Sequence, residues 1–175
     1  MWPIGPLMHE HRLIERMIAL LEGEAGRLRG GGALDAGFIA QAVDFVRTYA
    51  DRCHHGKEED ILFRDLAARE LPPELRTIMD ELVAEHQRGR ALVARLVAAA
   101  QRGEALAVAE LLAELADFYP RHIAKEDKRF FFPCMDLFTG AEKDAMLAEF
   151  DEFDRRLIHE KYAALVQERE AAVRG

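Results

Sequence analysis

Apolar residues recur at intervals of three and four along nearly the whole chain, which is the spacing of a helix that buries one face. The pattern predicts long helices over residues 7–29, 35–69, 73–102 and 104–131, and a fifth helix over about 140–172. No stretch shows the strict alternation of apolar and polar residues that is typical of a strand. We therefore expect an all-α fold.

Helix-breaking residues stand between these segments. Three glycines at 30–32 follow the first segment, Pro72 and Pro73 stand at the start of the third, Gly103 follows it, and Pro133 ends the fourth. Glycine leaves a helix more readily than other residues do, and proline is tolerated only in the first turn. The connections are therefore short, and none is long enough to separate two domains.

Two segments begin with side chains that cap a helix N-terminus. Asp35 precedes the second segment, and Thr139 stands three residues before Glu142 in the arrangement of a capping box. Four long helices with short connections pack most simply as an up-down-up-down four-helix bundle. We therefore expect a single domain over residues 1–175, with the bundle over about 7–132 and an additional C-terminal helix.

Ionisable residues interrupt the apolar stripes of all four bundle segments. A single histidine on such a stripe is more often a hydrogen-bonded core residue than a metal ligand. Burying four imidazoles and two carboxylates in one core without a cation would, however, be very costly. The candidate metal ligands are His11, His54, Glu58, His86, His122 and Glu126.

The order of these residues repeats along the chain. A Glu-His pair at 10–11 is followed by His-x-x-x-Glu at 54–58, and a second Glu-His pair at 85–86 is followed by His-x-x-x-Glu at 122–126. Residues four apart lie one above the other on a helix, so an imidazole and a carboxylate with this spacing can reach one metal ion. The duplication predicts two helical hairpins around a pseudo-twofold axis, with two metal ions and one bridging carboxylate from each half.

The repeat extends to the residues beside the ligands. Lys57 and Lys125 precede the two glutamates, while Glu59 and Asp127 follow them. The offset between the two copies is constant, since 125 − 57 and 127 − 59 both give 68. This agreement favours a duplicated site over a chance pairing of helical residues.

The second segment holds two adjacent histidines, and only one of them falls on the apolar stripe. His55 continues a row with Asp51 and Thr48 that reads as a face in contact with solvent. We therefore expect His54 to point into the bundle and His55 to point outward.

The acidic composition narrows the classes of partner. The formal net charge is −8, which disfavours nucleic acid and anionic membrane surfaces, because both require a basic face. No apolar run approaches the roughly 20 residues that a membrane-spanning helix needs. Met1 to Leu7 is too short, and too poor in positive charge, for a secretory signal. We expect a soluble protein of the cytoplasm.

The residue types also narrow the cofactor. Cys53 and Cys134 do not make a disulfide framework, and we expect both thiols to be reduced and buried. Neither stands at ligand spacing, which argues against an iron–sulfur cluster. Mixed imidazole and carboxylate ligation suits iron, zinc or manganese and argues against magnesium or calcium, which prefer oxygen ligands.

Four motifs together resemble the hemerythrin-like family of HHE cation-binding proteins. They are Leu-Met-His-Glu-His-Arg-Leu-Ile at 7–14, His-His-Gly-Lys-Glu-Glu at 54–59, Glu-His-Gln-Arg-Gly-Arg at 85–90 and His-Ile-Ala-Lys-Glu-Asp at 122–127. The resemblance covers about residues 5–138, and in one bacterial branch of the family it extends through the C-terminal helix. It implies a four-helix bundle that holds two iron ions in a non-haem, oxo- or hydroxo-bridged centre. Glu58 and Glu126 would be the bridging carboxylates.

One position departs from the oxygen-carrying members of the family. They use a second histidine four residues after the one on the third helix, and here that position is Arg90. The seventh ligand is therefore open, and Glu15 and His159 are the candidates. His9 is an alternative to His11, although His11 shares its stripe with more apolar residues.

The resemblance implies a protein that binds O2, NO or peroxide, for sensing or for defence against oxidative stress, without a catalytic residue that the sequence identifies. The alternatives are a di-iron enzyme for peroxide removal or for the repair of metal centres, and an iron-dependent interaction module. A protein partner or a homodimer stays open. A histidine-rich site with two bridging carboxylates favours binding and redox exchange over strong oxidation.

Overall fold

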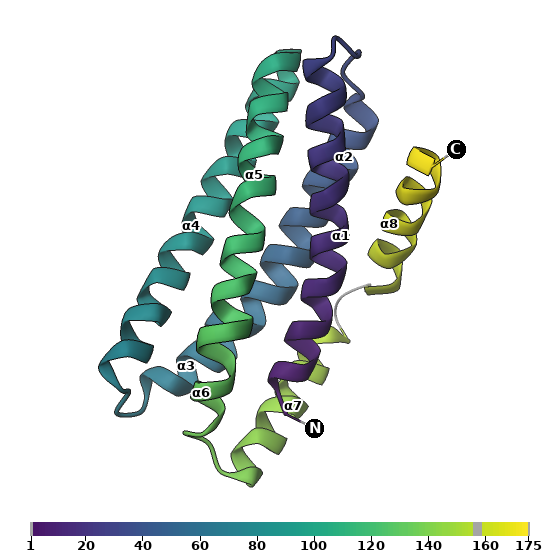
Figure 1. Ribbon diagram of the computed structural model, residues 1–175. Helices are drawn as coiled ribbons and strands as arrows, with labels where there is room; N and C mark the ends of the chain where they lie inside the picture. Colours follow the sequence, from purple (N-terminus) through teal and green to yellow (C-terminus); the bar gives the residue numbers. More distant parts are fainter. Residues whose placement is uncertain (1, 156–158, 175) are drawn as a thin grey trace.

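The computed structural model describes residues 2–155 and 159–174, and all regular secondary structure in these ranges is helical (Figure 1). Three of the four long segments are built on α1 (Ile4–Arg29), α4 (Pro73–Gln101) and α5 (Ala105–Lys125). The second segment, residues 36–67, lies between α1 and α4 in the chain. The four segments run alternately up and down, so the predicted all-α bundle is confirmed. None of the helices described is long and apolar enough to cross a bilayer.

The second segment changes its helical geometry along its length. It begins as α2 (Ala36–Phe45), continues as the π-helices η1 (Val46–His55) and η2 (Glu58–Phe63), and ends as α3 (Arg64–Ala67). A π-helix closes hydrogen bonds from residue i to i+5 and is frequently found at functional sites. The segment therefore departs from α-helical spacing where the candidate ligands lie.

The fourth segment departs from α-helical spacing at the equivalent place. The π-helix η3 (Glu126–Phe130) follows α5, and α6 (Phe131–Met135) completes the segment. Our prediction that Pro133 ends this helix was wrong, because Pro133 is the third residue of α6. The π turn interrupts the α-helical ladder just before it, so the missing N–H of Pro133 falls in a first turn, where no partner within the helix is needed.

The predicted helix boundaries agree with the structure elsewhere, with one extension at the start. The Asp35 carboxylate accepts a hydrogen bond from the Phe38 N–H, and the capping box of Thr139 and Glu142 is present. Gly103, with φ of +69°, follows α4 in a conformation that favours glycine. The first helix begins three residues earlier than expected, at Ile4, because Pro6 fits its first turn.

The predicted C-terminal helix is divided into α7 (Gly140–Asp154) and α8 (His159–Arg174). In Figure 1, α7 lies at the lower end of the bundle, whereas α8 lies beside α1 and the upper half. The protein has two separate apolar cores, one in the upper and one in the lower half of the bundle. The two parts of the helix pack on different cores, since Phe150 belongs to the lower core and Tyr162 belongs to the upper core. This divided packing explains why one straight helix does not form.

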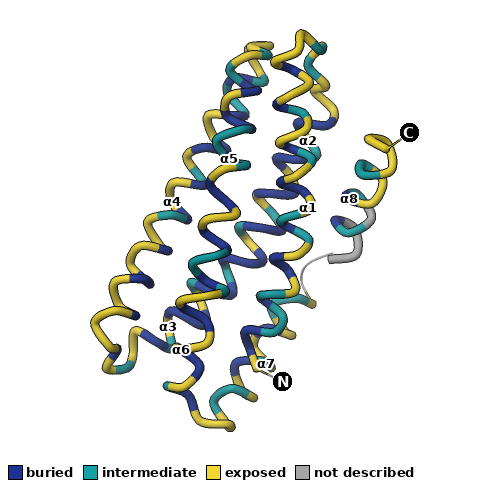
Figure 2. Tube along the Cα trace, in the orientation of Figure 1, coloured by how far each residue is buried: buried dark blue, intermediate teal, exposed yellow. Residues whose placement is uncertain are grey.

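A polar layer separates these two apolar cores. The upper core joins α1, α2, η1, α4, α5 and α8, and the lower core joins the other ends of the four segments with α7. Figure 2 shows that the buried residues of each helix face the interior of the bundle. The buried polar residues are Glu10, His11, His54, His55, Lys57, Glu58, His86, His122 and Glu126.

Candidate metal centre

Both adjacent histidines of the second segment point into the bundle. His54 is 1 % exposed and His55 is 2 % exposed, so the prediction that His55 faces solvent was wrong. Consecutive residues of an α-helix lie 100° apart, because 3.6 residues make one turn. The wider π turn reduces this separation, and the Gly56 N–H bonds to the Asp51 carbonyl five residues back. The π-helical geometry therefore directs the His55 side chain into the bundle, although α-helical spacing would place it on the solvent-facing side.

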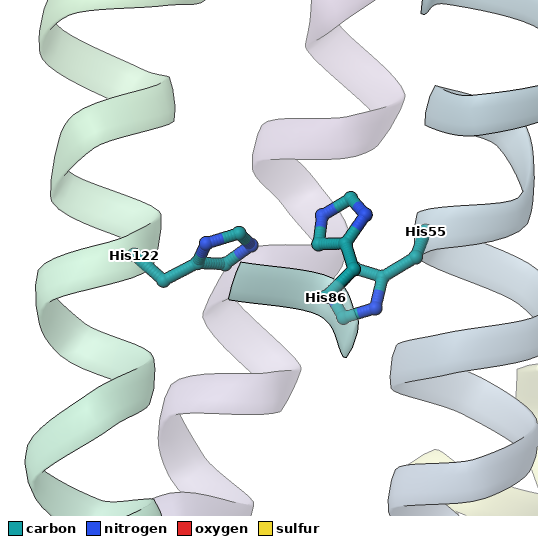
Figure 3. Close-up of side chains that lie close together, drawn as sticks. All are labelled: His55, His86 and His122. Atoms are coloured by element: carbon teal, nitrogen blue, oxygen red, sulfur yellow. The ribbon is translucent and has the colours of Figure 1, made fainter. Parts of the chain in front are cut away.

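Three histidines from three segments form one candidate ligand group. His55 on η1, His86 on α4 and His122 on α5 converge in the polar layer (Figure 3). Ligand atoms of all three lie within 4.8 Å of one another. The rings of His86 and His122 meet edge to face, with centroids 5.0 Å apart. We call these residues the three-histidine group.

The remaining candidate ligands form a second group at the same level. It comprises His11, His54, Glu58 and Glu126, whose ligand atoms also lie within 4.8 Å of one another. The Nε2 atoms of His11 and His54 are 2.9 Å apart. Within each of the two groups, imidazole nitrogens therefore lie close together in the interior of the bundle.

The two glutamates reach both groups. One oxygen of Glu58 lies 3.7 Å from His54 Nε2, and the other lies 3.4 Å from His86 Nε2. Each carboxylate is thus placed between an imidazole of one group and an imidazole of the other.

Glu126 repeats this arrangement from the opposite side. Its Oε2 lies 3.2 Å from His11 Nε2, and its Oε1 lies 3.0 Å from His122 Nε2. Two carboxylates that each span the two groups are the arrangement that a bridged pair of metal ions requires.

Several buried atoms of the layer lack a hydrogen-bond partner among the described residues. They are both carboxylate oxygens of Glu58 and of Glu126, together with the Nε2 atoms of His86 and His122. A buried polar atom without a partner costs about 1–3 kcal/mol, and more when the group is charged. All these atoms are metal ligands by type and converge on the same interior region, so they fit a bound metal cation.

Each of the five imidazoles donates the N–H at its Nδ1 atom to a carboxylate oxygen. This hydrogen bond orients the ring and leaves Nε2 to bind metal. The five Nδ1 contacts are His11 to Asp127 at 2.8 Å, His54 to Glu10 at 2.9 Å, His55 to Asp51 at 3.3 Å, His86 to Glu59 at 2.6 Å, and His122 to Glu85 at 2.8 Å. We call these five acidic residues the outer carboxylates.

Arg90 supports two of the outer carboxylates at once. Its Nε donates to Asp51 at 2.8 Å and its Nη2 donates to Glu59 at 2.9 Å. Arg90 therefore contacts the two carboxylates that bond the candidate ligands His55 and His86. Through these carboxylates it helps to position His55 and His86.

Each of the other three outer carboxylates forms an ion pair with a basic side chain. The pairs are Arg12 with Asp127, Lys57 with Glu10, and Lys125 with Glu85. Burial raises the pKa of the Glu10 and Glu85 carboxyl groups, but the histidine and the lysine beside each one outweigh burial and lower the pKa.

The sequence repeat is visible in these outer contacts. The glutamate of each Glu-His pair bonds the histidine of the His-x-x-x-Glu motif that follows, as Glu10 does with His54 and Glu85 does with His122. Glu59, which follows Glu58, bonds His86 of the second half, and Asp127, which follows Glu126, bonds His11 of the first half. His55 breaks the repeat, because the position 68 residues later is Ile123. No local signal in the sequence marked His55 as a candidate ligand.

The C-terminal helix α7 contacts this outer layer through Lys57. The Lys57 ammonium is fully buried and donates to Asp154, at the end of α7, at 2.7 Å as well as to Glu10. The ring of Phe153 lies over Gly56, where a Cβ atom would stand 2.8 Å from it. Glycine at position 56 therefore allows α7 to pack closely against the ligand-bearing segment.

Burial and neighbouring carboxylates pull the histidine pKa values in opposite directions. At His11, His86 and His122, burial lowers the pKa of the imidazole, but the surrounding carboxylates outweigh it and raise the pKa to about 10, about 11 and about 9. At His55, burial and the nearby His86 lower the pKa well below its ordinary value. Protons therefore compete with a metal cation for three of the five nitrogens.

The other sequence candidates lie apart from the two groups. Glu15 is partly exposed, and its carboxylate lies 2.9 Å from Arg12 Nη1. His9 is exposed. The side chain of His159 lies outside the part of the chain that the structure describes. Both Cys53 and Cys134 are buried free thiols, as expected.

These features define a helical-bundle protein with a histidine- and carboxylate-rich site that can hold a metal. The chain matches the family model of the hemerythrin HHE cation binding domain over residues 3–134 and again over 77–172, and it belongs to this family. The second match begins in α4, ahead of the second Glu-His pair, so it covers the second copy of the repeat. Comparisons with curated proteins and with solved structures gave no match.

Proposed function

We propose that the chain is a non-haem di-iron protein that binds O2 or a related small oxidant, such as NO or peroxide. The observation that carries this proposal is the position of Glu58 and Glu126, each with one oxygen toward each ligand group. A single cation would leave one of the two groups unused. Two cations use the ligand atoms of both groups.

In this proposal the first iron is held by His11 and His54, and the second by the three-histidine group. Glu58 and Glu126 contribute to both. Five imidazoles and two carboxylates are nitrogen-rich ligation, which suits iron among the metals that accept mixed nitrogen and oxygen ligands. His55 takes the place for which Glu15 and His159 were the sequence candidates. The two ligand groups are unequal, with two imidazoles on one side and three on the other.

A di-iron pair of this kind would supply reversible electron exchange and an open position for a small ligand. The chain itself orients the imidazoles through the outer carboxylates and excludes bulk water with the apolar cores above and below the layer. A position in the interior of the bundle restricts access to small molecules. These properties favour binding, sensing or defence against oxidants over the oxidation of large substrates, and a cytoplasmic location stays part of the proposal.

The test combines metal analysis with rapid mixing. Protein produced with ample iron should contain two iron ions per chain and show an absorption spectrum of a bridged ferric pair. Mixing the reduced protein with O2, and separately with peroxide, distinguishes the functions. An oxygen adduct that releases O2 under vacuum supports binding, and sustained O2 evolution from peroxide supports an enzyme. One iron or less per chain, or zinc under all conditions, contradicts the di-iron proposal.

A further inference from the structure

A series of polar contacts connects the metal centre to the end of α7. The Nδ1–H of the candidate ligand His54 donates to Oε2 of Glu10 at 2.9 Å, and the Lys57 ammonium donates to Oε1 of the same carboxylate. Lys57 also donates at 2.7 Å to Oδ1 of Asp154, the last residue of α7. Glu10 is 3 % exposed and Lys57 is fully buried. A helix outside the four-segment bundle therefore reaches a candidate ligand through buried charged groups.

Close packing joins the end of α7 to the segment that carries His54. The thiol of Cys53, the residue before His54, donates to Asp154 Oδ1 at 3.5 Å. The ring of Phe153 lies so near Gly56 that a Cβ atom at this glycine would stand 2.8 Å from it. Interiors packed at high density transmit the displacement of one element to its neighbours. A shift of α7 therefore reaches residues on both sides of His54.

The second copy of the repeat lacks such a connection to another helix. Its contacts lead from His122 to Glu85 and from Glu85 to Lys125, which also donates to Glu81 at 2.7 Å. Glu81 lies on α4 like Glu85, and its side chain is 50 % exposed. The series in the second copy thus ends in solvent, whereas the series in the first copy continues to α7. The connection is a property of the first copy and its C-terminal helix, not of the repeat.

Glu10 is the residue at which the two ends of the series meet. A carboxylate that accepts from Nδ1–H fixes the imidazole ring and raises the basicity of its other nitrogen. Glu10 divides its charge between this hydrogen bond and the Lys57 ammonium. Asp154 takes up part of the lysine charge, so more of the Glu10 charge is available to His54. The charge of Asp154 therefore influences the basicity of a candidate metal ligand that it does not touch.

We propose that Asp154 is a positioning residue for the metal centre, which orients the Glu10 carboxylate through Lys57 and so couples metal binding to the packing of α7. The inference rests on the metal centre proposed above and adds to it a connection between the ligand group of His54 and the C-terminal helix. The coupling is reciprocal, because a metal that strengthens the packing of α7 is bound more tightly by the same factor when α7 is packed.

The test measures metal affinity and the packing of α7 separately. The iron content of each protein is determined first. Asp154→Asn removes the charge and keeps the shape of the side chain, and competition with a chelator should show iron affinity lowered about fivefold or more. Iron loading should slow hydrogen exchange in α7 of the wild type, and this slowing should be about fivefold or more smaller in Asp154→Asn. Asp154→Glu restores the charge and should recover part of both effects.

Glu81→Gln is the matched control, because it neutralises the carboxylate in the equivalent place of the second copy. It should change neither iron affinity nor the effect of iron on exchange in α7. Equal iron affinity in the wild type and Asp154→Asn overturns the inference, and so does an equal effect of iron on exchange in α7 of these two proteins. An equal loss of affinity in Glu81→Gln also overturns it. Each of these results leaves a wild-type metal centre with two irons standing, whereas wild-type protein without the iron pair refutes both proposals.

Discussion

The imidazoles of His55 and His86 stack with their ring centroids 3.9 Å apart and an interplanar angle of 13°. The two residues come from different helices and are held from outside by one side chain, Arg90, through Asp51 and Glu59. This pair explains how the chain has five candidate imidazole ligands although Arg90 stands where oxygen carriers have a histidine. The adjacent position on η1 provides the fifth.

Replacing His55 should remove one metal ion and keep the fold. His55→Ala takes one of three imidazoles from the three-histidine group, so the iron content should fall from two to about one per chain. His9→Ala is the control, because His9 is exposed on α1 and should keep both irons. Elemental analysis and circular dichroism measure the two results. Full iron occupancy in His55→Ala would show that His55 is only a packed core histidine.

Weakening an outer carboxylate should lower the affinity for metal without removing a ligand. Asp127→Asn keeps the shape of the side chain that holds His11 but makes it a poorer acceptor. Loss of such a contact costs about 10- to 100-fold in metal affinity. Asp117→Asn changes an exposed aspartate on the same segment and should leave the affinity unchanged. Competition with a chelator gives both values, and equal affinities would argue against a role for Asp127 in positioning His11.

The two lysines of the repeat should differ in their effect on stability. Lys57→Met removes a fully buried cation between Glu10 and Asp154. Breaking a buried ion pair costs about 3–5 kcal/mol. Lys125→Met changes the equivalent residue, whose side chain is 18 % exposed, and should cost about 1 kcal/mol or less. Urea unfolding of both metal-free variants measures the difference. Equal losses would mean that the burial of Lys57 does not set its contribution.

Gly56 should respond to substitution differently from a glycine on an open helix surface. Alanine in place of Gly23, which has no atom within 4 Å of a Cβ, should raise the free energy of unfolding by about 0.5–1 kcal/mol. Gly56→Ala should not show this gain, because the new methyl group displaces the ring of Phe153.

The double variant Gly56→Ala with Phe153→Ala tests whether the contact between the new methyl group and the Phe153 ring is the cause, because that ring is then absent. Hydrogen exchange in α7 should rise in the Gly56→Ala single variant and stay unchanged in Gly23→Ala. A gain in stability from Gly56→Ala equal to that from Gly23→Ala would show that α7 does not need the close contact.

The metal-free and iron-loaded forms should respond to pH in opposite directions. In the metal-free protein the pKa values of His11, His86 and His122 lie above the ordinary value near 6.5, at about 10, 11 and 9. The stability from their protonation is fully present below about 6.5 and is lost as the pH rises through 9 to 11. Protons compete with iron, so iron occupancy instead falls as the pH decreases.

Melting temperatures of both forms, recorded from about pH 6 to pH 10, measure these trends. The metal-free protein should lose stability over the upper part of the range. Iron uptake near neutral pH should release protons, which calorimetry in buffers of different ionisation enthalpy detects. A metal-free melting temperature that rises from pH 7 to pH 10 would contradict the raised pKa values of these three histidines.

The sequence by itself predicted the all-α bundle, most helix boundaries and the six ligand candidates in the repeat. Each of these follows from local physics. The spacing of apolar residues indicates the helices, and an ionisable residue on an apolar stripe indicates a candidate ligand. Asp35, Gly103 and the capping box of Thr139 with Glu142 indicate helix ends. The repeat also marked the positions of several outer carboxylates, although not which histidine each one holds.

Only the tertiary structure decided the place of His55, because the π turn that directs it inward depends on hydrogen bonds that α-helical spacing does not anticipate. The same holds for the division of the C-terminal helix, whose two parts pack on different cores. The contacts of Arg90 and of Lys57 also join residues from separate helices. Side chains far apart in sequence meet there through packing, and no local pattern records which of them will come together.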